Sequence, residues 1–327
     1  MHIMRFALPL LLLCAFAAQS AKPSGAAELP GISRFIDEMV VKHQFRRDEL
    51  ENVFAHAQHL PAVIEAISRP ATIKPWLEYR AAFVNRRRVQ LGLEFWNKYR
   101  NTLRRAEKKY GVPQEIIVAV IGVETIYGQN AGSFRALDAL TTLAFDYPRR
   151  ADFFRTELEN YLLLAREQQF DLLDIRGSYA GALGIPQFMP SSYRNYAVDF
   201  NNNRKIDLLR EDRDAIGSVA NYLQGYGWIR NEPVTARVQG VGDFPASEAK
   251  ATRTLAEWAA AGVAAKGELV PEKSARLIDF TVEDGKEFWL AFENFEVITR
   301  YNNSDFYAMS VFQLAEELRA ARKAGKP

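Results

Sequence analysis

The sequence predicts a predominantly α-helical protein of the α+β class. Residues 31–230 carry apolar side chains at helical spacing, and β-branched or aromatic segments separated by turn residues follow Trp228. The composition of 48% hydrophobic and 25% charged residues is that of a globular chain rather than a disordered one. A length of 327 residues is enough for about two domains. The formal charge of +2 gives no reason to expect nucleic acid as a partner.

Residues 1–26 predict an export signal. Arg5 supplies a basic start, and the apolar stretch 6–16 is shorter than the roughly 20 residues that a membrane-spanning helix needs. Small residues follow this stretch, so we expect cleavage at about residue 26 and no transmembrane segment.

The single cysteine, Cys14, lies inside this apolar stretch. Leu13 precedes it, where the cysteine of a lipoprotein signal needs a small residue, so the sequence argues against lipid anchoring. The mature chain then has no disulfide, no thiol nucleophile and no thiolate metal ligand.

Residues 31–110 predict an N-terminal helical domain. Its clearest helix has apolar side chains at helical spacing, namely Phe95, Tyr99, Leu103, Ala106 and Tyr110. Gly111 follows as a helix-ending glycine. The basic residues between these positions are interpreted as a solvated face.

Residues 111–230 predict a second helical region. A proline opens the helix that contains Glu124, residues 149–170 form a long amphipathic helix, and residues 215–228 form a third. Glu157 and Glu159 are expected at the surface of the long helix. The stretch 175–193, rich in Gly, Pro and Ser, is expected to interrupt the helices.

Residues 231–303 predict a small β-containing domain, and 304–327 a C-terminal helix that returns to the helical domain. The expected strands are 233–239, 275–282, 286–292 and 295–302, with a helix at 252–263 after the first of them.

Glu124 is the most informative residue. Together with Ile117, Val120 and Ile121 it has the spacing i, i+3, i+4, i+7, which continues an apolar stripe that should face the interior. Burial raises the pKa of a carboxyl group, and a carboxyl that is protonated near neutral pH can act as a general acid. Periodicity alone leaves a simpler interpretation open, in which Glu124 is a structural carboxylate bonded to a buried arginine or to helix N–H groups.

Other catalytic classes receive little support from the sequence. All four histidines lie at or before residue 59, and the zinc motif HExxH is absent. No G-x-S-x-G motif suggests a serine nucleophile, although distant residues can form a triad. A glycine-rich phosphate loop and a dinucleotide fingerprint are also absent from the sequence.

The stretch 199–214 begins like a calcium loop. Oxygen ligands stand at alternate positions, and the candidate calcium ligands are the side chains of Asp199, Asn201, Asn203 and Asp214 and the carbonyl of Lys205. Two features depart from the pattern, because Arg204 replaces the usual glycine and Arg210 the usual glutamate. A structural calcium ion and an Asx-rich turn between helices both remain open.

Four motifs, in this order, resemble the lytic murein transglycosylase B family: GVETIYG, GSYAGALGIPQFMPSSY, DAIGSVANYL and NFEVITRYN. The resemblance covers roughly residues 35–314. It implies a lysozyme-like catalytic core at 111–230, flanked by the helical domain and the small β-containing domain. It also implies a periplasmic enzyme whose partner is the peptidoglycan glycan strand, with no cofactor required for the chemistry.

The resemblance implies the reaction and the site residues. Such enzymes cleave the β-1,4 bond between N-acetylmuramic acid and N-acetylglucosamine and leave a 1,6-anhydromuramic acid end. Glu124 matches the single catalytic acid/base. The implied substrate-binding residues are Ser178, Gln187, Tyr222, Tyr301 and Tyr79. Core packing is the alternative role for each tyrosine, and the stretch 199–214 corresponds to the family's calcium loop with one extra residue.

Three other functions remain open at this level. A muramidase of the same fold would add water and produce reducing ends. A non-catalytic peptidoglycan-binding protein would bind glycan without turnover. A protein whose main role is calcium-dependent structure would change its folding and binding on chelation.

Overall fold

The computed structural model describes residues 24–25, 29–69, 74–240, 251–267 and 270–325. Most of the predicted export signal, including Cys14, lies outside these residues. The chain forms two compact units, and of the described residues the first unit holds 74–123 and 220–325 and the second 24–69 and 124–219. Within the described part of the chain, every helix is too short or too polar to cross a membrane.

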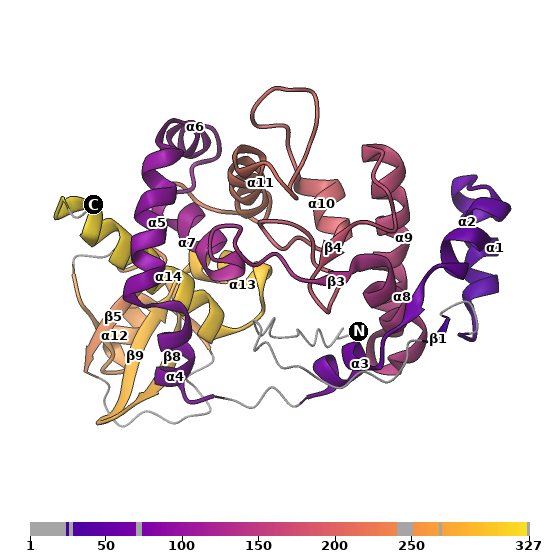
Figure 1. Ribbon diagram of the computed structural model, residues 1–327. Coiled ribbons are helices and arrows are strands. Elements are labelled where there is room, and N and C mark those ends of the chain that lie inside the picture. Colours follow the sequence, from indigo (N-terminus) through magenta and orange to yellow (C-terminus); the bar gives the residue numbers. More distant parts are fainter. Residues whose placement is uncertain (1–23, 26–28, 70–73, 241–250, 268–269, 326–327) are drawn as a thin grey trace. The chain divides into compact units, whose positions relative to one another are not determined.

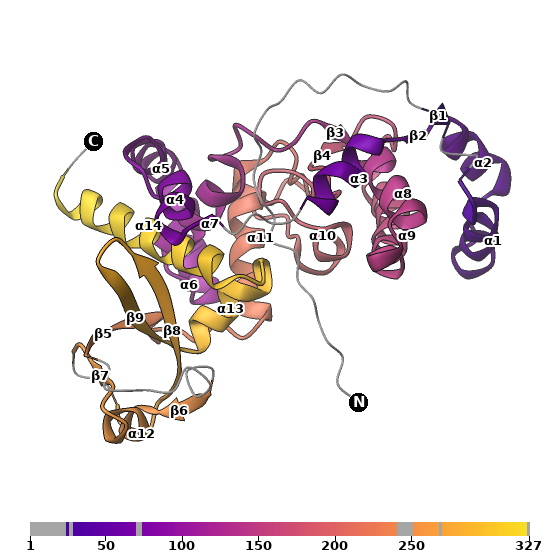
Figure 2. The ribbon, with the colours of Figure 1, turned by 90° about the horizontal axis from the view of Figure 1, so that it is seen from below.

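The second unit is built mainly of helices (Figures 1 and 2). They are α1 (Ile32–His43), α2 (Arg47–Ala55), α3 (Pro61–Ser68), α8 (Ala136–Asp146), α9 (Ala151–Gln168) and α10 (Pro190–Tyr196), with a 3-10 turn at Pro148–Arg150. Two short antiparallel pairs join β1 (Ser24–Gly25) to β2 (Gln58–His59) and β3 (Phe134–Arg135) to β4 (Arg176–Gly177). The chain passes between the units within α7 (Gln114–Thr125) and α11 (Asp212–Gly225).

Helix α8 forms the centre of the second unit and packs along α9 (Figure 2). Every residue from Ala136 to Ala144 is buried, including polar ones that need partners. Asp138 accepts hydrogen bonds from the Gln58 N–H at 2.9 Å and from the Arg135 guanidinium at 2.8 Å. Buried polar groups of α8 therefore fix the segment around β2 to the helical core.

The sequence interpretation of Glu157 as a surface residue is wrong. Glu157 is only 4% exposed, because α10 covers this face of α9. Its carboxylate accepts hydrogen bonds from the N–H of Ser191 at 2.9 Å and from the Ser191 hydroxyl at 2.6 Å. Burial raises the pKa of Glu157, and the bonds from Ser191 oppose that shift. The local amphipathic pattern carried no signal that a second helix would pack there.

The first unit contains helices and one sheet. Its helices are α4 (Trp76–Phe83), α5 (Arg86–Lys98), α6 (Arg100–Tyr110), α12 (Leu255–Ala260), α13 (Glu293–Tyr301) and α14 (Asp305–Lys323). The predicted continuous helix from Phe95 to Tyr110 is interrupted at Tyr99, where ψ is 19°. It ends at Gly111 in a left-handed conformation with φ of 80°, as the sequence predicted.

The C-terminal helix α14 lies against α4 and α5 (Figure 1). Arg80 on α4 bonds to Gln313, and Arg322 donates to Asn97 at 3.2 Å. The Arg322 guanidinium also stands 4.5 Å from the centre of the Trp96 ring. Polar and cation–π contacts in the middle and at the C-terminal end of α14 therefore hold it on helices that precede it by more than 200 positions in sequence.

The sheet has five antiparallel strands in the order β6–β8–β9–β5–β7. Their bounds are β5 (Thr235–Gly240), β6 (Thr252–Thr254), β7 (Ala264–Ala265), β8 (Ser274–Val282) and β9 (Gly285–Ala291). The predicted strands 233–239, 275–282 and 286–292 correspond to β5, β8 and β9. The predicted helix at 252–263 starts later, because Thr254 and Glu257 form a capping box that begins α12 at Leu255.

The predicted strand at 295–302 is wrong, because this segment is helix α13. Its β-branched and aromatic residues favoured a strand, but Phe295 and Ile298 are buried at helical spacing. The first turn contains Glu293 and Glu296 and the last turn contains Arg300, which suits the helix dipole. The charges at the two helix ends and the burial of residues three positions apart therefore outweighed the β propensity of the individual residues.

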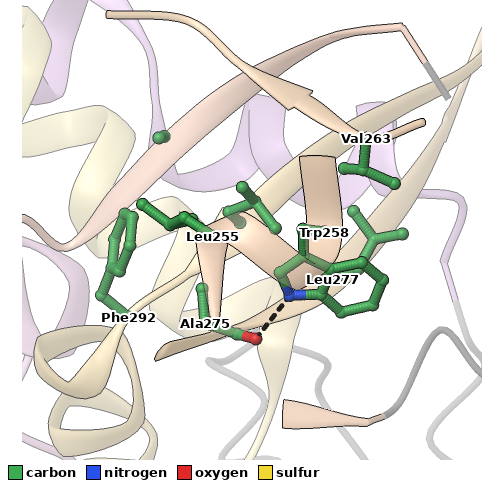
Figure 3. Close-up of a cluster of buried hydrophobic side chains, with 8 residues drawn as sticks. Leu255, Trp258, Val263, Ala275, Leu277 and Phe292 are labelled. Carbon is green, nitrogen blue, oxygen red and sulfur yellow. Dashed lines mark hydrogen bonds between the residues drawn. The ribbon is translucent and has the colours of Figure 1, made fainter. Parts of the chain in front are cut away.

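A compact apolar cluster fills the space between α12 and the sheet (Figure 3). Trp258 is fully buried at its centre and donates its indole N–H to the Ala275 carbonyl at 2.8 Å. Leu255, Leu277 and Phe292 are buried in the same cluster. The short helix α12 thus contributes most of its apolar surface to the core of this region.

We predict that Trp258→Ala destabilises the sheet region by about 3–5 kcal/mol, the usual cost of truncating a buried aromatic residue. The check is hydrogen exchange of the β8 and β9 amides in the folded protein. Val270→Ala is the control, because Val270 is 57% exposed and its truncation should change protection by less than about 0.5 kcal/mol. Equal protection in the two variants would contradict this account of the core.

Candidate active site

Glu124 lies in the last turn of α7 and is only 2% exposed. The sequence predicted this burial from one apolar stripe, but the structure buries other faces of the helix as well. Val118, Ala119 and Val120, on successive faces of the helix, are each 0% exposed. From Ile116 onward α7 is therefore buried on all sides, and Glu124 places a carboxyl group near the end of this mainly apolar stretch.

The backbone leaves α7 through an unusual turn directly after Glu124. Ile126 has φ of 53°, Tyr127 has 59° and Gly128 has 85°, so three consecutive residues are left-handed. This conformation is disfavoured for a β-branched residue such as isoleucine and persists only where the surrounding structure fixes it. The side chain of Thr125 does part of this, because its hydroxyl donates to the Ile185 carbonyl at 2.8 Å and accepts from Gly128 N–H at 2.9 Å.

Ser178 and Gln187 lie in the segment that Thr125 contacts, within the same unit as Glu124. Ser178 is 7% exposed, and its hydroxyl accepts from the Ala182 N–H at 3.1 Å. Gln187 is 9% exposed and donates its amide to the carbonyls of Ala131 at 3.0 Å and Gly184 at 2.9 Å. Both predicted side chains are therefore held by backbone groups in fixed positions.

Two glycines allow the backbone segments of this region to approach closely. A Cβ on Gly132 would lie 2.1 Å from the Gly177 carbonyl oxygen, beside the pairing of β3 with β4. A Cβ on Gly184 would lie 2.2 Å from the Leu208 carbonyl oxygen, and Gly184 also has φ of 68°. Both glycines are thus required by contact between backbones, although the sequence indicated Gly184 only as part of a helix-interrupting stretch and made no prediction for Gly132.

The three predicted tyrosines belong to the other unit. Tyr222 is 5% exposed and donates its hydroxyl to the Arg300 carbonyl at 2.7 Å, with its ring centre 4.7 Å from that of Tyr301. Tyr79 is 7% exposed and packs 4.9 Å from Phe83. The structure brings Tyr222 and Tyr301 together and seats Tyr79 in an aromatic cluster of its own.

Sequence reasoning missed Tyr226, whose ring packs against the pair formed by Tyr222 and Tyr301. The ring of Tyr226 lies 4.6 Å from that of Tyr222, and the residue is 39% exposed. The two tyrosines are one helical turn apart in sequence, so their i, i+4 spacing was the available signal.

The loop from Asp199 to Asp214 is organised by its own polar side chains. Asp199 accepts from the N–H groups of Asn203 at 3.1 Å and Arg204 at 2.7 Å, and Asn203 accepts from Lys205 N–H at 2.8 Å. Arg204 has φ of 69°, the left-handed conformation that a glycine provides at the sixth position of a calcium loop. The loop therefore combines the predicted Asx-turn network with a calcium-loop backbone at Arg204.

Asp214 is fully buried beneath this loop. One carboxylate oxygen accepts from the N–H groups of Phe200 at 2.8 Å and Asn201 at 3.2 Å, and the other accepts from Asp207 N–H at 3.0 Å. Burial raises the pKa of Asp214, while the three backbone bonds act in the opposite direction. Asp214 thus stabilises the loop.

Within the described part of the chain, no group of three or more His, Cys, Asp or Glu side chains converges as a metal site.

Comparison with known proteins relates this geometry to a family. The model of the transglycosylase SLT domain family matches residues 28–316. The chain is 43% identical to the membrane-bound lytic murein transglycosylase B of Escherichia coli strain K12 over 306 residues, which cover 90% of this chain and 84% of that protein.

Solved structures agree with this relationship. The soluble lytic transglycosylase SltB1 from Pseudomonas aeruginosa superposes with a TM-score of 0.85 at 47% identity, covering 90% of this chain and 100% of that one. The Escherichia coli lytic transglycosylase Slt35, solved in complex with calcium, superposes with a TM-score of 0.85 at 43% identity over 90% and 95% of the two chains. The likeness confirms the predicted fold class, a predominantly helical α+β protein with a lysozyme-like core.

We predict that Gly184→Ala destabilises the protein by about 2–5 kcal/mol. A left-handed alanine costs about 1–2 kcal/mol, and the contact with Leu208 adds about 1–3 kcal/mol of overpacking. Gly227→Ala is the matched control, because Gly227 has φ of 99° but nothing within 4 Å of its Cβ position. Urea denaturation of both variants measures the difference, and equal losses of stability would show that the close approach at Gly184 does not matter.

Proposed function

This chain belongs to the lytic murein transglycosylases that carry the transglycosylase SLT domain, and from that premise we propose how its residues perform the reaction. It is an enzyme that acts on peptidoglycan. The reaction is cleavage of the β-1,4 bond between N-acetylmuramic acid and N-acetylglucosamine with formation of a 1,6-anhydromuramic acid end. Our assignment of residues is supported by the position of Glu124 within the family motif GVETIYG, at the buried end of α7.

Glu124 is the general acid and then the general base. Burial favours the protonated carboxyl, which gives its proton to the departing glycosidic oxygen as the C1–O bond breaks. The N-acetyl group of the muramic sugar stabilises the positive charge that develops at C1. The ionised carboxylate then takes the proton from the O6 hydroxyl of the same sugar while O6 bonds to C1.

One carboxylate is sufficient in this scheme because the substrate supplies the remaining groups. Glycosidases with two carboxylates use the second one as a nucleophile or as the base that activates water. Here the acetamido oxygen stabilises the cation, and the sugar's own hydroxyl replaces water. The proton returns to Glu124, so the residue is ready for the next cleavage without an external acid.

The other predicted residues bind and orient the glycan. Ser178 and Gln187 are held by backbone groups beside the Thr125–Ile185 contact, so their polar atoms need no reordering when substrate binds. We assign Tyr222, Tyr301 and Tyr79 to the glycan groove on the family resemblance. Because Tyr222 is 5% exposed and Tyr79 is 7% exposed, only the small exposed part of each of these two can contact sugar. In this proposal residues 111–230 are the catalytic core, flanked by the helical region 31–110, the β-containing region 231–303 and the C-terminal helix of 304–327.

The loop at 199–214 binds a structural calcium ion in this proposal. The side chains of Asp199, Asn201 and Asn203 and the Lys205 carbonyl supply hard oxygen ligands, as calcium prefers. Support comes from the left-handed Arg204 and from the related Slt35 structure solved with calcium. Asp214 stabilises the loop through its backbone bonds and is the remaining candidate ligand. The ion has no part in the bond cleavage.

The site of action is the periplasm. An enzyme that acts on peptidoglycan must reach the cell wall, and the basic and apolar start of the chain resembles an export signal. The related Escherichia coli protein is described as membrane-bound. For this chain we propose export without a lipid anchor, because Leu13 precedes Cys14.

We predict that Glu124→Gln abolishes turnover and leaves glycan binding intact, because glutamine keeps the shape but cannot transfer the proton. Mass spectrometry of muropeptides released from purified peptidoglycan measures the reaction. Anhydromuropeptides should come from the wild type alone. Reducing-end products would indicate a hydrolase, and equal release by both proteins would remove Glu124 from the mechanism.

We predict that calcium raises the thermal stability of the wild type and that Asp199→Asn weakens this effect. Binding at about 100 times the dissociation constant adds about 2.7 kcal/mol to the free energy of unfolding. Asp174→Asn is the control, because Asp174 is an exposed aspartate outside the loop. A chelator should reverse the stabilisation. Identical midpoints with calcium and with chelator would refute the calcium proposal and leave the Asx-turn network as the explanation of the loop.

A further inference from the structure

Arg88 is a buried cation to which the reaction scheme gives no role. It is 7% exposed and lies in the first turn of α5. Its guanidinium donates to the carbonyls of Gly122, of Val123 at 3.4 Å and of Ala82 at 3.2 Å. The guanidinium carbon also stands 5.3 Å from the centre of the Phe83 ring.

The guanidinium of Arg88 is in an electrostatically unfavourable position for a side chain of α5. The first turn of a helix carries partial positive charge, so a cation there is disfavoured, and burying a cation away from water adds a further cost. Asn85 caps this helix by accepting from the Arg88 N–H at 3.0 Å, so the backbone of Arg88 is well placed there. The side chain, by contrast, donates hydrogen bonds to carbonyls of a different helix.

That element is the end of α7. The last four carbonyls of a helix have no partner within it, and Gly122 and Val123 are two of these four residues in α7. A cation is favourable at this negative end of the helix. Arg88 therefore caps, from a distant helix, the turn in which Glu124 follows Val123.

We propose that Arg88 is a positioning residue for Glu124, because it holds the carbonyl end of α7 and so fixes the turn from which the catalytic carboxyl projects. This inference rests on the proposed role of Glu124 as the acid/base. Precise placement matters because a shift of about 1 Å at the reacting groups can cost about 100-fold in rate. Substrate binding by the tyrosines, Ser178 and Gln187 does not depend on the placement of the Glu124 carboxyl.

The test compares Arg88→Met and Arg88→Lys with wild type in initial rates on soluble, uncrosslinked glycan strands, per molecule of folded enzyme. We expect kcat to fall about 100-fold in Arg88→Met with KM changed less than about twofold. Arg88→Lys keeps the charge and some donors, so it should recover a substantial part of kcat. A purely structural role would lower the folded fraction and leave the kcat of folded molecules unchanged.

Arg230→Met is the matched control. Arg230 likewise donates to a carbonyl in the last turn of a helix, that of Lys108 in α6 at 2.9 Å, but that helix carries no candidate catalytic residue. Its loss should leave kcat unchanged. Wild-type kcat in folded Arg88→Met overturns the proposal. If that variant does not fold, wild-type kcat in folded Arg88→Gln, which removes the charge but keeps a polar side chain, overturns it instead.

Glu124→Gln in the same assay distinguishes a failure of the proposed role of Arg88 from a failure of the proposed role of Glu124. An inactive Glu124→Gln beside a fully active Arg88→Met would reject the role of Arg88 and leave the function intact. An active Glu124→Gln would reject the acid/base assignment itself, and the role of Arg88 with it.

Discussion

A carboxyl group buried in the last turn of an apolar helix is the constraint on which the rest of the site depends. Such a group is costly to remove from water, so the surroundings must hold it in one position. The chain must also leave the helix at once, and it does so through left-handed Ile126 and Tyr127. A turn of this kind is maintained by contacts from outside it. Thr125, which follows Glu124 in the chain, provides such contacts, and Arg88 binds the carbonyls of Gly122 and Val123, which precede it.

The same constraint explains the glycine-rich stretch that accompanies Glu124. To reach the residues after Thr125, the backbone around Gly177 must lie against Gly132, and that around Gly184 must lie against Leu208. Side chains at these glycines would separate the segments that carry Ser178 and Gln187 from the turn that follows the catalytic candidate. Backbone packing, rather than flexibility, is the reason for the composition of this stretch.

Burial of a carboxyl group does not by itself reveal catalysis in this protein. Glu157 is 4% exposed and Asp214 is 0% exposed, nearly the same as Glu124 at 2%. Glu157 and Asp214 have structural roles, because Glu157 accepts hydrogen bonds from Ser191 and Asp214 accepts them from three backbone N–H groups of its loop. What singles out Glu124 is family membership together with the fixed segments around it, not the amount of surface it loses.

The sequence by itself determined the elements with strong local periodicity and the residues that lie within family motifs. The burial of Glu124, the end of α6 at Gly111 and strands β5, β8 and β9 follow from patterns a few residues long. The fold class follows from such patterns repeated along residues 31–303. Tertiary structure decided what those patterns cannot encode. Residues 295–302 became a helix through their buried faces and end charges, and Glu157 was covered by α10, which begins more than 30 positions later. Arg88 donates to a carbonyl 34 positions later, at the end of α7, although a cation is disfavoured in the first turn of its own helix, α5. Local patterns record which face of an element is apolar, but a partner from a distant segment is chosen only when the whole chain packs.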